Sequence, residues 1–171
     1  MIQFTKIHLD YAGVKWTVKA KSKEESRYGL FNVLSTGKRI VATDGHRMHI
    51  YKLQTEEIPK GIYEVIEAKG MIIFNLTNKQ ISEFPDWMAV IPRHKRAITI
   101  KVMGNPKEDN VEAVATLFRA MPEDRVVNLK YLSDALGDGD IWKVNVDKEA
   151  NDALLFRNGR KVAVVMPMRL K

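Results

Sequence analysis

Short runs of β-branched and aromatic residues alternate with polar residues along most of the chain, and turn-forming residues separate the runs. Runs of this length predict strands, and the turn residues between them favour antiparallel pairing. Strands are expected at residues 29–34, 39–43, 47–53, 61–66, 71–76, 98–103, 141–146, 153–157 and 161–166.

Two segments instead have the apolar spacing of a helix with one buried face. The first follows Asn110 and is closed by Pro122, and the second follows Asn128 and ends at Gly137. Asparagine is a favoured residue before a helix, and proline and glycine are favoured after one. Both segments are therefore predicted to be helices.

A third segment, residues 10–23, fits two patterns. Its stretch VKWTVKAK alternates like a strand, whereas Tyr11, Val14 and Val18 fit a helix with Asp10 as its cap. Periodicity alone does not decide between the two. In either case, many strands and few helices predict an α+β protein made of antiparallel sheets.

The length of 171 residues suits one ordinary domain or two small ones, and 45% hydrophobic residues are enough for a core. The strand pattern breaks over residues 82–97, where FPDW and IPRHKR carry two prolines. A stretch of this kind is typical of a linker. The sequence therefore predicts a domain boundary here, with domains at residues 1–92 and 93–171.

Several protein classes are excluded or disfavoured. The longest apolar stretches are far shorter than the roughly 20 residues that a membrane span needs. The N-terminal MIQFTKIHLD lacks the pattern of a secretory signal, so a cytoplasmic location is expected. The chain has no cysteine, which excludes disulfides, thiolate metal sites and cysteine nucleophiles.

The formal net charge of +7 suggests an anionic partner such as nucleic acid. If residues 10–23 are helical, Lys15, Lys19 and Lys23 lie on one face, because positions four apart are neighbours. Such a face is either a stripe that meets phosphates or an ordinary solvated surface. No groove-reading or base-stacking motif accompanies it, so sequence-specific recognition is not expected.

The segment VATDGHRMHIYKL has the strongest local signal. Asp44 and Gly45 predict a two-residue hairpin turn between strands. An enzyme could pair Asp44 with His46 as an acid and base, but no nucleophile motif lies nearby. His46 and His49 are three residues apart on a strand, which puts them on opposite faces. We therefore expect no metal, no cofactor and no catalysis here.

The chain closes on an apolar segment, AVVMPMRL at residues 163–170. Chain ends without a docking partner are usually disordered. This end is therefore expected to be packed or to take part in binding.

Five segments in order, RYGLFNVL, VATDGHRM, EFPDWMAVIP, NLKYLSDAL and AVVMPMRL, resemble the family of bacterial sliding clamps, the β subunits of replicative DNA polymerase III. The resemblance covers most of the chain. It implies a DNA clamp-like fold in which residues 1–92 are similar to the second clamp domain and residues 93–171 to a shortened third one. It also favours a helix over residues 10–23.

The resemblance has two departures. Ala89 stands where the family often has a basic residue. The chain is also less than half of a full clamp, lacks a counterpart of the first domain and omits a helix and strands expected between Ile62 and Phe74.

The resemblance implies a non-catalytic processivity factor. Clamps encircle duplex DNA without sequence preference, as rings whose helices line a basic hole. A hydrophobic pocket between the second and third domains captures short motifs of polymerases, clamp loaders and repair proteins. By motif, the peptide-binding residues are Leu30, Thr43, Gly45, His46, Arg47, Met48, Pro85, Val90, Val164, Val165, Met166, Pro167, Met168 and Arg169. Lys15, Lys19 and Lys23 are the expected DNA contacts.

Three functions follow as hypotheses. The first is a clamp-like processivity factor that binds motifs of replication proteins and forms a homo-oligomeric ring, in which three copies of two domains would give six. The alternative is a free-standing, clamp-derived peptide-binding module of viral or mobile-element origin that does not encircle DNA. The third, which the lack of a nucleophile motif disfavours, is an enzyme that uses Asp44 and His46.

Overall fold

The computed structural model describes residues 1–24, 29–92, 97–101, 110–121, 126–137, 141–145 and 153–168. The chain divides into two compact units, unit 1 at Met1–Trp87 and unit 2 at Met88–Lys171. The sequence placed a domain boundary a few residues later in the same linker. The correspondence of these units with particular clamp domains stays a prediction.

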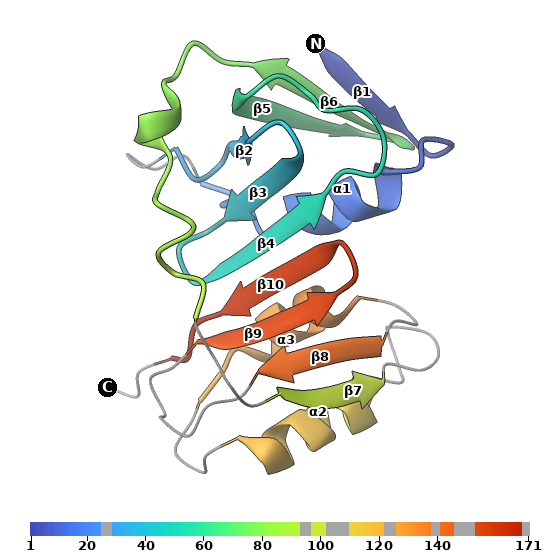
Figure 1. The fold of residues 1–171 in the computed structure, drawn as a ribbon, viewed down its shortest axis with the longest axis vertical. Helices are drawn as coiled ribbons and strands as arrows, with labels where there is room; N and C mark the ends of the chain where they lie inside the picture. Colours follow the sequence, from blue (N-terminus) through green and yellow to red (C-terminus); the bar gives the residue numbers. More distant parts are fainter. Residues whose placement is uncertain are drawn as a thin grey trace. The chain divides into compact units, whose positions relative to one another are not determined.

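Unit 1 is an antiparallel sheet with one helix in its described residues (Figure 1). Its strands follow the spatial order β1-β6-β5-β2-β3-β4. Helix α1 packs against β1, β3, β4 and β6. The elements are β1 (Ile2–Thr5), α1 (Tyr11–Val18), β2 (Val33–Ser35), β3 (Arg39–Thr43), β4 (Arg47–Lys52), β5 (Gly61–Ala68) and β6 (Met71–Leu76).

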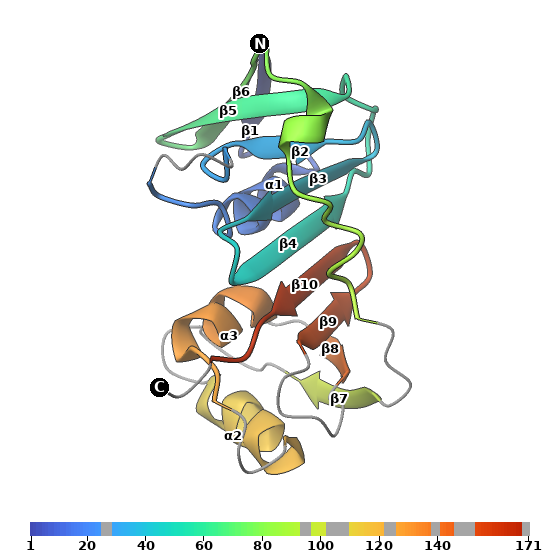
Figure 2. The same cartoon turned by 90° about the vertical axis from the view of Figure 1, so that its left-hand side faces the viewer.

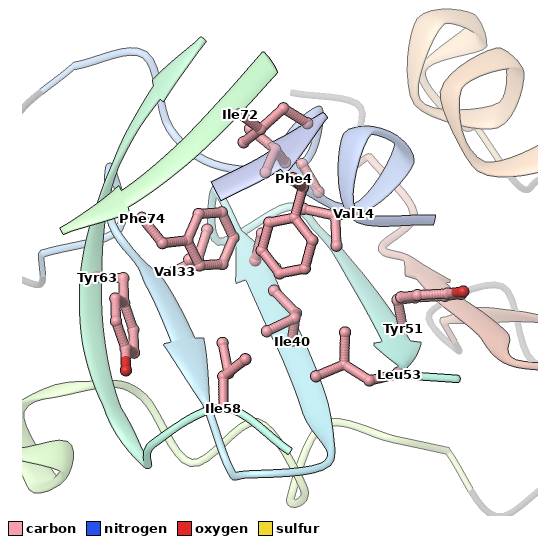
Figure 3. Packing of buried hydrophobic residues seen from close by; sticks show 13 residues of the cluster. Phe4, Val14, Val33, Ile40, Tyr51, Leu53, Ile58, Tyr63, Ile72 and Phe74 are labelled. Carbon is pink, nitrogen blue, oxygen red and sulfur yellow. The ribbon is translucent and has the colours of Figure 1, made fainter. Parts of the chain in front are cut away.

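The core of unit 1 lies between α1 and the sheet (Figure 3). Phe4 and Phe74 meet edge to face with ring centroids 5.3 Å apart, and Tyr63 lies 5.7 Å from Phe74. Val14 of α1 and Ile40 of β3 are fully buried in the same cluster. Alternate residues of the strands therefore form one apolar layer, as the sequence pattern requires.

Close packing against β4 fixes α1. Trp16 stacks on His49 with ring centroids 4.1 Å apart, and His49 Nδ1 lies 2.9 Å from the Trp16 carbonyl oxygen. Gly13 lies directly against the ring of Tyr51. The absence of a side chain at residue 13 lets the helix backbone approach the sheet.

The carboxylate of Asp10 holds the chain after β4. It accepts hydrogen bonds from the Tyr51 hydroxyl at 2.9 Å, the Gln54 amide at 2.7 Å and the Thr55 amide at 3.2 Å, and from the Thr55 hydroxyl. Asp10 is the N-cap residue of α1, as predicted, but its side chain makes no cap bond to the helix. The carboxylate instead links the start of α1 to residues 51–55.

Unit 2 places its helices on one side of its sheet (Figure 2). The strand order is β10-β9-β8-β7, and every pair is antiparallel. Helix α2 packs against β7, and α3 packs against β10. The elements are β7 (Ala97–Lys101), α2 (Asn110–Ala120), α3 (Leu129–Leu136), β8 (Ile141–Asn145), β9 (Leu154–Asn158) and β10 (Lys161–Val165).

The last part of unit 1 is a short 3-10 turn, η1 (Ile81–Glu83), followed by the FPDW segment. The Gln80 amide donates to the Glu83 carboxylate at 2.7 Å, and the two residues form a capping box. Phe84 is buried, and Pro85 is exposed. This segment is therefore anchored by its aromatic residue.

Most predicted elements are present. Residues 39–43 and 71–76 form strands with the expected bounds, and residues 10–23 contain a helix. The prediction for residues 29–34 is partly wrong, because a turn at Gly29 precedes β2 and the Asn32 amide donates to the Gly29 carbonyl at 3.0 Å. Strand β1 was not predicted. The predicted ends at residues 102–103 and 146 and the closing Pro122 lie outside the described residues.

Within the described residues, no helix is long and apolar enough to cross a membrane.

Candidate functional site

The predicted hairpin turn is shifted by one residue. Strands β3 and β4 are paired as far as Thr43 and Met48, and the Asp44 amide donates to the Arg47 carbonyl at 3.3 Å. Gly45 and His46 are thus the two central residues. Gly45 has a φ of +90°, a value that favours glycine.

Polar side chains stabilise this turn. Asp44 Oδ1 accepts from the amides of His46 and Arg47, both at 3.0 Å, and Asp44 Oδ2 accepts from Arg47 Nε at 3.0 Å. The Thr43 hydroxyl donates to the Arg47 carbonyl at 2.7 Å and accepts from the Gly45 amide at 3.1 Å. The turn therefore has a fixed shape before any partner binds.

Arg47 is a structural residue of the turn. Its side chain is only 7% exposed, and its Nη2 donates to the Lys19 carbonyl at 2.7 Å, just after α1. Because the guanidinium binds Asp44 and Lys19 at once, it joins the turn to the end of the helix. Direct contact between Arg47 and a peptide stays a prediction.

The unit 1 residues of the predicted pocket lie around this turn. Leu30 is half-buried, and its Cδ1 lies 3.7 Å from the point that a Cβ on Gly45 would occupy. Gly45 and His46 are exposed, whereas Thr43 and Met48 are buried. Unit 1 therefore offers an accessible surface at Leu30, Gly45 and His46, with Thr43 and Met48 beneath it.

The connector residues named from the sequence are accessible. Pro85 is exposed in unit 1, and Val90 is exposed by 49% in unit 2. Both keep surface for contact with a partner.

The side chains of the unit 2 tail become more exposed toward its end. Val164 and Val165 are buried in β10, where they pair with Leu155 and Leu154. Met166 and Met168 are 38% and 51% exposed, and Pro167 is half-buried. Arg169 lies outside the described residues. The accessible part of the tail is therefore residues 166–168.

The backbone anchors this tail. The Met168 amide donates to the Val126 carbonyl at 2.7 Å, and the two residues form an antiparallel bridge. Leu129, at the start of α3, is 59% exposed. Asn128 accepts from the Lys130 amide at 2.9 Å, as expected of a helix cap. The sequence did not indicate that Val126 and Leu129 lie at the tail. The contact with Val126 is a backbone bridge, which no side-chain pattern reveals.

The three lysines do not share one helical face. Lys15 is in α1, but the helix ends at Val18, Lys19 is its C-cap and Lys23 lies beyond. The expectation of a helical stripe over all three is therefore wrong. All three lysines are exposed, and their role in DNA binding stays a prediction.

The acid and base pair considered at Asp44 and His46 has little chemical support. Both carboxylate oxygens of Asp44 are engaged by the turn and by Arg47. His49 is buried against Trp16, away from His46 in the turn. In the part of the chain that the structure describes, no group of three or more His, Cys, Asp or Glu side chains is arranged to hold a metal ion.

Solved structures resemble the chain over nearly its whole length. A DNA polymerase sliding clamp from Pseudomonas aeruginosa matches 99% of this chain and 66% of its own, with a TM-score of 0.66 and 16% identity. The chain has the sliding-clamp fold. The pol III beta of Caulobacter crescentus matches with a TM-score of 0.65 and 18% identity, over 99% of this chain and 65% of its own. A sliding clamp from Bacillus subtilis matches with a TM-score of 0.63 and 19% identity, over 99% of this chain and 64% of its own.

The predicted α+β fold of the clamp type is thus confirmed. The chain spans just under two thirds of the length of these clamps, so the expectation from the sequence of less than half is wrong. No protein-family model matches the sequence, and no curated protein matches it.

Proposed function

We propose that this protein is a non-catalytic, clamp-like processivity factor that binds short linear motifs of replication proteins. Its partners would be a replicative DNA polymerase and proteins of the clamp-loader type. The observation that carries the proposal is the sliding-clamp fold over 99% of the chain.

The tail of unit 2 supports a peptide-binding role. Met166 and Met168 stay exposed although the backbone of the tail is fixed on Val126. Methionine side chains adapt to apolar ligands of different shape. An anchored backbone with exposed methionines has less conformational entropy to lose on binding than a free end would have.

The turn of unit 1 supports the same role. Gly45 and His46 are presented by a turn that Asp44 and Thr43 hold in shape. Leu30 adds an apolar contact beside Gly45. We propose the turn surface of unit 1 and the tail surface of unit 2 each as a peptide contact.

Truncation of either surface is expected to weaken peptide binding. Met168→Ala should raise the Kd of a labelled peptide with a clamp-binding motif about tenfold or more, because burying one apolar side chain is worth roughly 1.5–3 kcal/mol. His46→Ala should also weaken it. Fluorescence anisotropy measures both effects.

The matched control is Ile66→Ala, which truncates an apolar side chain on β5 that is 46% exposed. This variant should bind the peptide like the parent protein. Unchanged affinity in both Met168→Ala and His46→Ala would contradict the proposed peptide site.

We propose that duplex DNA is bound without sequence preference through Lys15, Lys19 and Lys23. Replacement of all three with glutamate is expected to weaken DNA binding at least tenfold and to leave peptide binding intact. If each lysine contacts one phosphate, the slope of log K against the logarithm of the salt concentration should become shallower by roughly 3. Anisotropy titrations of a labelled duplex over a range of salt concentrations measure both quantities.

The control replaces Lys52, Lys60 and Lys69, three exposed lysines of unit 1, with glutamate. An equal loss of DNA binding in both triple variants would show a general charge effect and refute the assignment. The mass in solution separates the two forms of the function. A closed oligomer supports a ring around DNA, and a persistent monomer supports the module that binds peptides alone.

A further inference from the structure

The sheet of unit 2 has a second face that the helices do not cover. Trp142 and Val144 of β8 are fully buried, and Phe156 of β9 pairs with Val144. Neighbouring residues along a strand point to opposite faces. Helices α2 and α3 lie on one side of the sheet (Figure 2). Lys143 and Arg157 alternate with the buried residues of their strands and therefore project from the other side.

Two cationic residues lie opposite each other on this outer face. Lys143 and Arg157 are cross-strand partners, and both are exposed. Like charges directly opposite one another destabilise a sheet. Among the described residues, neither side chain has an acidic partner within ion-pair distance. The pair is therefore an arrangement that an anion would stabilise.

Arg157 is held in place from within its own sheet. Its Nη1 donates to the side-chain oxygen of Asn145 at 2.6 Å, and Asn145 is only 5% exposed. A guanidinium has five N–H donors in a planar fork. The bond to Asn145 uses one of them and orients the rest, so the group is prepared for a carboxylate.

Apolar surface flanks the two cations. Ile141 lies two residues before Lys143 on the same face and is 57% exposed. Val162 is the cross-strand partner of Arg157 and is half-buried. Thr99 of β7 is the second cross-strand partner of Lys143 and is exposed. We name the set the outer patch, which consists of Thr99, Ile141, Lys143, Arg157 and Val162.

The outer patch suits a peptide better than a nucleic acid. Single-stranded nucleic acids bind on aromatic side chains that stack with bases, and none of the five residues is aromatic. Cations beside an aliphatic side chain on one face instead match an extended segment in which acidic and apolar residues stand two positions apart. Residues two positions apart in an extended segment lie on the same face, so such a segment presents carboxylates and an apolar side chain to the patch together.

We propose that the outer patch binds an extended acidic peptide segment of a partner protein. Carboxylates of the segment pair with Lys143 and Arg157, and an apolar side chain at one end covers Ile141. The patch lies on the sheet face opposite to the helices and contains no residue of the tail. It is therefore a second binding surface, and it does not depend on the proposed clamp function.

A binding assay with charge-reversed variants tests this proposal. The probe is a fluorescein-labelled peptide with the repeat Glu-Ser-Leu-Ser, in which glutamate and leucine share one face of the extended chain, and it has no clamp-binding motif. The Kd should rise at least tenfold when Lys143→Glu and Arg157→Glu are combined. Lys143→Gln alone leaves the Arg157–Asn145 bond intact and should raise the Kd at least threefold, so it decides the question if the double variant does not fold.

The chain provides a matched control. Arg39 and Lys52 are also exposed cross-strand partners, on β3 and β4 of unit 1. Their same-face neighbours Val41 and Ile50 are buried, so this pair has no exposed apolar neighbour like Ile141. Combined Arg39→Glu and Lys52→Glu changes the net charge equally and should keep the Kd within twofold of the parent.

Three outcomes overturn the proposal. Equal weakening by the two double variants would show that only the overall charge matters. Equal binding of a control peptide with lysine in place of glutamate would exclude recognition of carboxylates. Displacement of the acidic peptide by an oligothymidylate, together with loss of oligothymidylate binding in Lys143→Gln, would assign the patch to nucleic acid.

Discussion

Gly13→Ala is expected to lower the free energy of unfolding by about 2 kcal/mol. A Cβ at residue 13 would overlap ring carbons of Tyr51, with Cδ2 only 2.6 Å away. Overpacking a core costs about 1–3 kcal/mol and sometimes more. Alanine recovers about 1 kcal/mol of helix propensity relative to glycine, which the overlap must outweigh.

The ring of Tyr51 has little freedom to move aside, because its hydroxyl donates to Asp10 at 2.9 Å. Urea unfolding measures the effect. In a Tyr51→Leu background, Gly13→Ala should instead raise the free energy of unfolding, because the ring is absent and only the helix propensity of alanine remains. Stabilisation by Gly13→Ala in the parent protein would contradict the packing of α1 on β4.

Asp10→Ala is expected to lower the free energy of unfolding by about 3 kcal/mol. The change removes the acceptor for the Tyr51 hydroxyl and for the amides of Gln54 and Thr55. Hydrogen bonds to a charged group contribute about 1.5–3 kcal/mol each, and donors left without a partner add a desolvation cost. Urea unfolding measures this loss when Asp10→Ala is compared with the parent protein and with the surface control Glu64→Gln.

The contribution of Asp10 should depend on pH in one direction. Burial alone would raise the pKa of the Asp10 carboxyl, but hydrogen bonds from Thr55, Gln54 and Tyr51 outweigh it and lower the pKa below its ordinary value. The stabilisation is then complete above the unfolded-state pKa of about 3.9 and is lost as the pH falls through the lower folded-state pKa. The stability gap between the parent protein and Asp10→Asn should be constant above about pH 5 and shrink in acid.

The strands could be predicted where local chemistry agrees with packing. Residues 39–43 and 71–76 alternate clearly and are bounded by turn residues, so their limits match the prediction. Strand β1 was missed because Phe4 is its only fully buried residue and its four residues give too short a pattern. Residues 29–32 look like a strand in composition, but Gly29, with a φ of +62°, begins a turn.

The candidate site was predictable in its parts and not in its details. The turn at residues 44–47 could be expected from its glycine, but its centre depends on the hydrogen bonds of Asp44. The burial of Arg47 depends on the Lys19 carbonyl, 28 residues away in the sequence, so no local pattern indicates it. The anchoring of Met168 on Val126 is likewise a long-range backbone contact.

The most direct test of peptide binding is an NMR titration of protein labelled at its methionine methyl groups. A peptide with a clamp-binding motif is expected to shift the methyl signals of Met166 and Met168 saturably, with a micromolar Kd, and to leave those of Met1 and Met71 unchanged. No saturable binding up to millimolar peptide, or binding that leaves both tail methionines unshifted, would contradict the proposed function.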